Sequence, residues 1–164
     1  GSTSMVESLV VDEWIFDTLT ADATLQGLLA VDNRSPSYQQ GIYLYLAPEK
    51  DPISLRQPQV PYIVVRHTDA GQTDTTSMCG GRIVTTSSHQ VWCWDTQSGA
   101  VSMARIKAIV DRIDTLLNKQ SVNSTTPVFF LNRASVSSSV DVSQDGRVDN
   151  GISQLYIATI TPEV

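Results

Sequence analysis

Hydrophobic and polar positions along the chain follow first a helical period and then a strand period. From Met5 to Leu19 apolar residues recur at helical spacing, which predicts an amphipathic helix. Its apolar positions are Leu9, Val10, Trp14, Ile15, Phe16 and Leu19, and the other side carries Glu7, Asp12, Glu13 and Asp17. This segment is therefore expected to bury one face against the rest of the protein.

A second, shorter helix is expected directly afterwards. Thr20 and Asp22 are suitable N-cap residues, because their side-chain oxygens accept from the first backbone N–H groups of a helix. The leucines of this helix are Leu25, Leu28 and Leu29, and it should end near Asp32 and Asn33. The two helices together predict a helical hairpin.

Proline limits regular structure between Asn33 and Val60. This segment holds four of the seven prolines, namely Pro36, Pro48, Pro52 and Pro58. Each proline lacks a backbone N–H and restricts the residue before it. We expect a strand near Ile42 to Leu46, with a long loop on either side.

Two long strands are predicted in the middle of the chain. Val60 to Thr68 is apolar on both faces, as in a central strand. Asp69 to Arg82 is rich in Gly, Thr, Ser and Asp and is expected to be a long mobile hairpin loop. Arg82 to Asp95 alternates, and Thr85 to Ser88 is expected to project beyond the sheet. One face should carry Ile83, His89, Val91 and Cys93, and the other Val84, Trp92 and Trp94.

A long helix and a terminal hairpin complete the predicted elements. Ser98 to Asn118 has one apolar stripe, made of Ile106, Ile109, Val110, Ile113, Leu116 and Leu117. Val128 to Val142 and Ile152 to Ile160 flank the turn dipeptide Asp145-Gly146, which predicts a β-hairpin with one solvated face.

This order of elements predicts an α/β protein of the α+β type. We expect a mainly antiparallel β-sheet with helices packed on one side: two short N-terminal helices, and one long helix after the central strands. A chain of 164 residues fits a single domain, residues 5–164. Gly1 to Ser4 is interpreted as an expression-tag remnant before Met5.

Charge and composition narrow the range of partners. The formal net charge is −6, with only 11 Lys and Arg residues, and these are scattered. Strong nucleic-acid binding requires clustered basic residues, so DNA is expected to pass the protein without adhering to it. No apolar run approaches the roughly 18 residues of a membrane span, and both cysteines, Cys79 and Cys93, are expected to be reduced.

Metal sites are tested by ligand spacing. The motif Asp141-x-Ser143-x-Asp145-Gly146-x-x-Asp149 resembles the first half of a calcium loop, but the twelfth position, where a bidentate Glu is needed, is Ile152. His67, Cys79, His89 and Cys93 are zinc-ligand types. However, His89 and Cys93 are four residues apart on one strand, so their side chains lie about 13 Å apart, too far to bind the same ion.

Catalytic motifs are also lacking. There is no Gly-x-Ser-x-Gly motif, and in a chain with this many serines some will lie near a histidine by chance, so such proximity does not indicate a hydrolase. Gly80-Gly81-Arg82 lacks the Gly-Lys-Ser/Thr ending of a phosphate-binding loop. Cys79 has no activating setting, Cys93 occupies a core position, and His67 and His89 are expected to hydrogen-bond within or beside the sheet. We predict no enzyme activity, no cofactor and no metal.

The order of elements resembles the tail terminator, or tail completion, proteins of long-tailed bacteriophages. Pro61-Tyr62-Ile63-Val64-Val65 matches a Pro-Tyr-apolar strand of that family, and Gln90-Val91-Trp92-Cys93-Trp94 matches a strand that alternates up to an aromatic residue. Ala100 to Leu117 matches its long helix. The match covers nearly the whole chain, and its motifs are patterns of apolar residues. Trp92 departs from the family pattern, which has a polar residue at this position.

The resemblance implies a structural virion protein of the phage tail and neck, assembled in the host bacterial cytoplasm. Such a protein forms a hexameric ring that caps the tail tube, ends tail polymerisation and joins the tail to the head. The implied partners are further copies of the chain, the tail tube protein and the head–tail connector. The alternatives are a head–tail connector or stopper and, from another class, a small α/β ligand-binding or enzymatic domain.

Candidate contact residues come from this sequence and not from the family. Two tryptophans, Trp92 and Trp94, share one face of their strand. They are expected either to cover the core beneath a helix or to anchor a subunit contact. Basic residues on the outer face of the long helix are expected to meet a neighbour's carboxylates. The predicted subunit or tube contacts are Arg105, Lys107, Arg112, Thr73, Asp74, Arg82 and Trp92.

Overall fold

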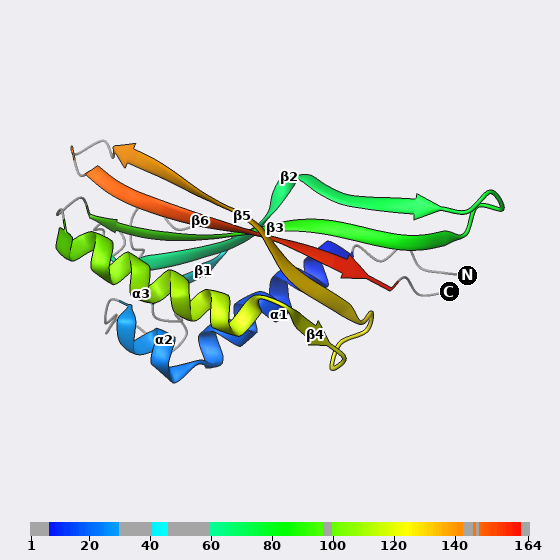
Figure 1. The fold of residues 1–164 in the computed structure, drawn as a ribbon, viewed down its shortest axis with the longest axis horizontal. Coiled ribbons are helices and arrows are strands. Elements are labelled where there is room, and N and C mark those ends of the chain that lie inside the picture. Colours follow the sequence, from blue (N-terminus) through cyan, green and yellow to red (C-terminus); the bar gives the residue numbers. More distant parts are fainter. Residues whose placement is uncertain are drawn as a thin grey trace.

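A computed structural model describes residues 7–29, 41–45, 60–96, 100–142, 146 and 148–161 (Figure 1). Within these residues the predicted α+β fold is confirmed. The elements in chain order are α1 (Glu7–Ala21), α2 (Ala23–Leu28), β1 (Ile42–Leu44), β2 (Tyr62–Thr76), β3 (Arg82–Thr96), α3 (Ala100–Leu117), β4 (Gln120–Val122), β5 (Phe129–Val142) and β6 (Val148–Ile160).

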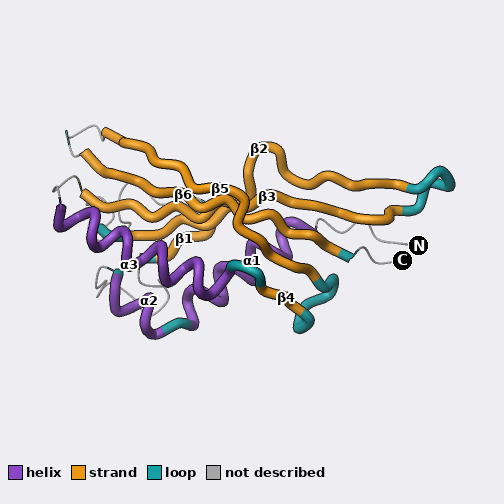
Figure 2. The backbone as a smooth tube through the Cα atoms, viewed as in Figure 1, coloured by secondary structure: helices purple, strands orange, loops and turns teal. Residues whose placement is uncertain are grey.

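The strands form one six-stranded sheet in the order β1-β2-β3-β6-β5-β4. Only β1 runs parallel to its neighbour β2, and the other pairs are antiparallel. Helices α1 and α3 lie against the same face, because both contact side chains from alternate positions of β3 (Figures 1 and 2). We call this the helix-covered face, and the opposite one the helix-free face.

The hydrophobic core lies between the helices and this face of the sheet. Its α3 stripe is as predicted, and Trp14 of α1 packs edge-on against Phe129 of β5, with ring centroids 5.5 Å apart. Fully buried members include Val11, Ile15, Leu19, Ile63, Val65, Val91, Cys93, Ile109, Ile113, Leu117, Leu131, Tyr156 and Ala158. None of the helices in the described part of the chain has the length and apolar character of a membrane span.

The buried face of α1 differs from the prediction. Leu9 is exposed, whereas the acidic residues Glu7 and Asp12 are buried. The helix presents Ser8, Asp12 and Ile15 to the sheet. The backbone N–H of Ser8 donates to Gln72 Oε1 of β2, and the Asp12 carboxylate accepts from His89 of β3. Tertiary hydrogen bonds therefore decide the orientation of α1 where apolar spacing alone is ambiguous.

The second helix begins as predicted, since the Asp22 side chain accepts from the backbone N–H of Leu25 at 2.9 Å. It is shorter than predicted and ends at Leu28. The expected end at Asp32–Asn33 and the expected long loops on either side of β1 lie outside the described residues.

The segment from Asp69 to Arg82 was predicted to be a loop, but most of it is strand. β2 continues to Thr76, and Gln72 to Thr76 pair with Ser87 to Arg82 of β3. Threonine has a high β-propensity, and this outweighs the polar composition. The turn itself is confined to residues 77–81, where the N–H of Ser77 donates to the carbonyl of Gly81 at 2.7 Å. Gly80 has a φ of 86°, a conformation that favours glycine.

Thr85 to Ser88 do not project beyond the sheet. All four pair with β6 on one side, Thr85 to Ser87 pair with β2 on the other, and Thr85 and Ser87 are buried. The projecting part is the end of the β2–β3 hairpin from Gln72 to Val84, which we call the arm; it extends past the helices (Figure 1).

The terminal hairpin of β5 and β6 is confirmed, with one correction. The hairpin was predicted to have one solvated face, but Val136, Val140 and Val142 of β5 are exposed although they alternate with its polar residues. Helix α3 covers only the first part of β5, so both faces of its second part are solvated. Strand β4, which pairs with Phe129 to Leu131, was not predicted.

Candidate assembly surface

A buried carboxylate ties helix α1 to both strands of the hairpin. Asp12 Oδ1 lies 2.6 Å from Nδ1 of His89, and Asp12 Oδ2 lies 2.7 Å from Nδ1 of His67. Because a carboxylate only accepts hydrogen bonds, each imidazole carries a proton on Nδ1. As predicted, both histidines hydrogen-bond beside the sheet. Their shared partner fixes where α1 sits on β2 and β3.

Ser87, His89 and Asp12 are linked in the order of a serine-hydrolase triad. Ser87 Oγ lies 2.5 Å from Nε2 of His89, whose Nδ1 donates to Asp12. However, the three residues are 1%, 0% and 0% exposed. A nucleophile must meet its substrate, and no carbonyl group can approach the Ser87 hydroxyl in this conformation. The arrangement therefore acts as a packing element between α1 and β3.

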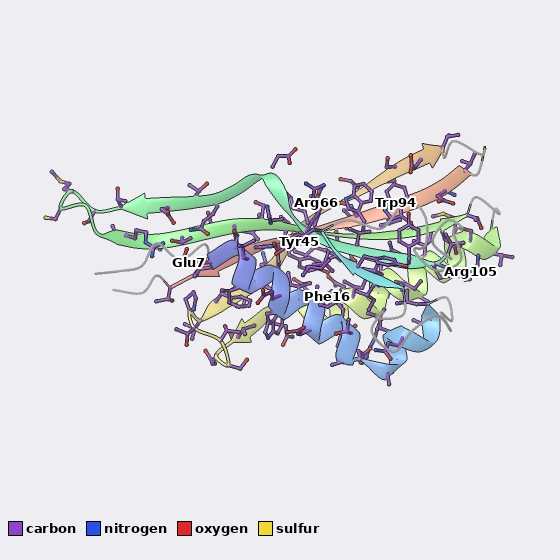
Figure 3. All side chains as sticks on the ribbon, turned by 180° about the vertical axis from the view of Figure 1, so that it is seen from behind. Glu7, Phe16, Tyr45, Arg66, Trp94 and Arg105 are labelled. Atoms are coloured by element: carbon purple, nitrogen blue, oxygen red, sulfur yellow. The ribbon has the colours of Figure 1, made fainter. Side chains whose placement is uncertain are left out.

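A second polar cluster holds the base of the arm. Glu7, at the start of α1, accepts from Arg82 Nη1 at 2.6 Å and from Gln72 Nε2 at 2.7 Å (Figure 3). The Glu7 hydrogen bond raises the pKa of Arg82. Asp74 accepts from the Thr85 hydroxyl at 2.7 Å, and this bond lowers the pKa of Asp74. The arm is thus anchored to α1 through Glu7, which lies 65 residues before Gln72 and 75 before Arg82 in the sequence.

The three basic residues of α3 that were predicted to contact neighbours all have partners within the chain. Arg105 forms two hydrogen bonds of 2.8 Å with the buried Asp95. Arg112 forms two, of 2.8 and 2.7 Å, with Asp22, the N-cap of α2. Lys107 pairs with Asp111 one turn further along α3, and both side chains are exposed. Arg105 and Arg112 therefore stabilise the subunit, and Lys107 is the most accessible of the three.

The other predicted contacts lie in two places. Thr73, Asp74 and Arg82 are all on the arm, where Thr73 is exposed and the other two belong to the cluster around Glu7. Trp92 is on the helix-free face, far along β3 from the arm. The structure thus brings three of the seven residues together and places α3 and Trp92 apart from them.

Trp92 and Trp94 do not cover the core beneath a helix. They stack on each other on the helix-free face, with ring centroids 5.1 Å apart and an interplanar angle of 14°. Both are half-buried, and Gly151 of β6 lies beneath Trp94. The prediction that one of them anchors a subunit contact stays a prediction.

The cysteines behave as their positions suggest. Cys93 is buried in the core, which raises the pKa of its thiol, whereas Cys79 is exposed at the turn of the arm. No group of three His, Cys, Asp or Glu side chains that could hold a metal occurs among the residues the structure describes. Asp141 and Asp149 of the calcium-like motif pair across β5 and β6, while Ser143 and Asp145 lie outside the described residues.

The long edges of the sheet are open along part of their length. β4 pairs with β5 only from Phe129 to Leu131, and β1 pairs with β2 only from Ile63 to Val65. No described strand pairs with the outer side of β5 from Asn132 to Val142, or with the outer side of β2 from Arg66 to Thr76. Open strand edges are the most direct route to assembly that this fold presents.

Sequence reasoning missed the polar contacts of α1. The available signal was position: Asp12 lies one residue after Val11 and three before Ile15, both of which are buried. A carboxylate inside an apolar helical stripe requires a partner, and the strands carry two histidines. That combination is the sequence signal for the Asp12–His89 bond.

Comparison with solved structures finds chains with a similar fold. A chain in the solved structure described as "Virion of native gene transfer agent (GTA) particle" has the same fold, with a TM-score of 0.65. The likeness covers 98% of this chain and 100% of that chain at 14% sequence identity. No family model and no curated protein sequence matches the chain.

Proposed function

We propose that this protein is a structural component of a phage-like virion, and that it acts as a tail terminator. It caps the finished tail tube as a ring, ends tube polymerisation and offers the surface to which the head joins. The observation that carries this proposal is the likeness over the full length of both chains to a component of a gene transfer agent virion. At 14% identity this likeness shows a shared fold, and the role as a terminator is tested by the state of the tails.

Two features of the subunit support a role in assembly. The arm is anchored at its base by the cluster around Glu7 and presents an exposed end. The candidate triad is sealed in the core. The part of the chain that the structure describes therefore offers accessible contact surface at the arm and the sheet edges.

The proposed partners are further copies of this chain, the tail tube protein and a head–tail connector. Among the predicted contact residues, Thr73 and Lys107 are exposed enough to meet a partner without loss of an internal support. Arg105 is unsuitable for a charge-reversal test, because a carboxylate beside the buried Asp95 would destabilise the subunit itself.

The decisive experiment removes the gene and restores it in particles that encode this chain. Tail lengths are counted by negative-stain electron microscopy. A terminator predicts tails of abnormal length without the protein, and normal tails when it is restored. Tails of normal length that fail to join heads would instead indicate a connector or stopper, and normal particles would refute the proposal.

A direct binding test complements the genetic one. Purified protein is mixed with its own tail tubes, and the ends are imaged. We expect additional density at one end of the tube only. Density distributed along the tube, or none at either end, contradicts capping.

A further inference from the structure

The open part of β5 lacks the usual protection of an edge strand. Edge strands of monomers normally carry lysine or proline, or are short. From Asn132 to Val142 there is neither, and the exposed side chains of Val136, Val140 and Val142 are 53%, 59% and 64% accessible. A bulge interrupts the strand between Arg133 and Ser135, but the eight residues after it run regularly against β6. Such an edge is well suited to accept another strand.

The arm lacks a neighbouring strand along its sides. Beyond Thr85 it is a two-stranded ribbon, because β6 ends opposite that residue, and an isolated two-stranded ribbon is only marginally stable in water. Beyond Thr85 both sides of the ribbon lack a described partner strand, and the outer side of β2 stays unpaired back to Arg66. The open edge of β5 lies on the other side of the sheet and at its opposite end, so one chain cannot bring the two together.

We propose that the arm of one copy pairs through β2 with the open edge of β5 of a second copy, so that the sheet continues from subunit to subunit. The contact joins unlike surfaces, and repeated contacts of this kind either close a ring or grow a filament. The proposal deepens the ring assembly of the proposed function and rests on it for its biological meaning.

Strand direction and charge both favour this occupant. Within the sheet β5 runs antiparallel to β2, so a sheet continued in the same sense would bring the two edges together antiparallel. The open edge of β2 carries Arg66 at its start and Asp74 on the arm, and β5 carries Arg133 at its start and Asp141 near its end, all exposed. Within their own chain Arg66 lies 3.6 Å from Asp69 and Arg133 lies 3.2 Å from Asp114, and antiparallel pairing would bring an aspartate of the second copy toward each of these exposed pairs.

A parallel arrangement would place Arg66 near Arg133 and Asp74 near Asp141. Like charges on facing strands are destabilising. Both pairs of charges are eight residues apart in the sequence, but the pair on β2 spans the bulge between His67 and Gln72. Arg66 and Asp74 therefore lie opposite residues five apart on β3, whereas Arg133 and Asp141 lie opposite residues seven apart on β6. The charge pattern favours the antiparallel over the parallel direction, without fixing the register.

The test uses three full-length double variants. The edge variant is Val136→Lys with Val140→Lys, the arm variant is Thr73→Lys with Thr75→Lys, and the control is Val101→Lys with Met103→Lys on the exposed side of α3. Val101 and Met103 are 65% and 46% accessible, which matches the edge valines. All six side chains are exposed, so each variant should fold.

Sedimentation velocity over a concentration series gives the mass of each species. We expect closed oligomers for the wild type and the control, and the 17.9 kDa single chain for the edge and arm variants. An equimolar mixture of the two variants keeps one intact contact, so it should form dimers and nothing larger. A two-fold contact between the β5 strands of two copies predicts a different result. The arm variant would still assemble, and the mixture would contain only the species that each variant forms alone.

The proposal is overturned if the edge variant assembles like the wild type, if the mixture stays monomeric, or if the wild type is a single chain at every concentration. Failure of the proposed function looks different. If the edge variant is monomeric and the particles that contain it still have normal tails, the edge contact stands and the terminator role falls. If gene removal gives abnormal tails but the edge variant assembles normally, the terminator role stands.

Discussion

Gly151 of β6 lies directly beneath the indole ring of Trp94. A Cβ atom at this position would stand 2.6 Å from two carbons of the Trp94 ring, closer than real Cβ atoms approach other heavy atoms. Gly151 and Trp94 are cross-strand partners in the antiparallel pairing of β3 and β6. The glycine therefore makes room for the stacked pair of tryptophans on the helix-free face.

Gly151→Ala is expected to lower the free energy of unfolding by about 1 to 3 kcal/mol, the usual cost of overpacking. The Trp94 ring must move, and with it the stack on Trp92. Urea unfolding followed by tryptophan fluorescence measures both effects. The matched control is Gly27→Ala in α2, where a Cβ atom meets nothing within 4 Å, and this change should be neutral or stabilising. Equal stability of the two variants would contradict the close contact.

Asp12→Asn is expected to destabilise the protein by about 1 to 3 kcal/mol, because the amide offers one acceptor oxygen where two imidazole N–H groups need one each. One donor is then left unsatisfied inside the core. The control is Asp17→Asn, an exposed acidic residue on the same helix, which should change stability by less than about 0.5 kcal/mol. An Asp12→Asn protein that unfolds at the wild-type urea concentration would show that the bonds contribute nothing.

Periodicity predicted most of the fold. The apolar stripe of α3 and the alternation of β3 each allow only one buried face. Ile106 and Val91 were therefore correctly predicted to be buried. Composition was a weaker guide. It predicted a loop at Thr73 to Thr76, where pairing with β3 makes a strand.

The contact residues could not be predicted to the same degree. Whether Arg105 is free or bound depends on Asp95, which is ten residues away and on another element. The exposure of Val136 depends on how far α3 extends over β5, a tertiary fact with no local signal. Surfaces for assembly are defined by what the fold leaves uncovered, so they appear only once the sheet and helices are placed.

The two cysteines should differ sharply in reactivity. A thiol reagent such as DTNB attacks the thiolate, and burial both hides Cys93 and raises its pKa, while Cys79 is exposed. We expect one thiol to react in the native protein and the second only after unfolding. Cys79→Ser should abolish the native reaction. Cys93→Val should leave it and cost less than about 1.5 kcal/mol, since the swap nearly conserves apolar volume.

The pair of Asp22 and Arg112 should make stability depend on pH in a defined direction. Hydrogen bonds from Arg112 are the largest cause of the lowered pKa of Asp22, and the N–H of Leu25 adds to it. A carboxyl group with a lowered folded pKa contributes stability above its unfolded pKa of about 3.9. This contribution is lost as the pH falls through the lower, folded value.

Arg112→Gln should therefore cost about 1 to 2 kcal/mol at neutral pH and almost nothing once Asp22 is protonated in the folded state. The measurement is urea unfolding of wild type and variant over a series from about pH 7 down to about pH 2.5. Lys107→Gln is the control on the same helix, because its pair with Asp111 is exposed and should contribute less than about 0.5 kcal/mol at any pH. A difference between wild type and Arg112→Gln that stays constant across the series would assign the role of Arg112 to packing of its side chain, and not to its ion pair with the cap of α2.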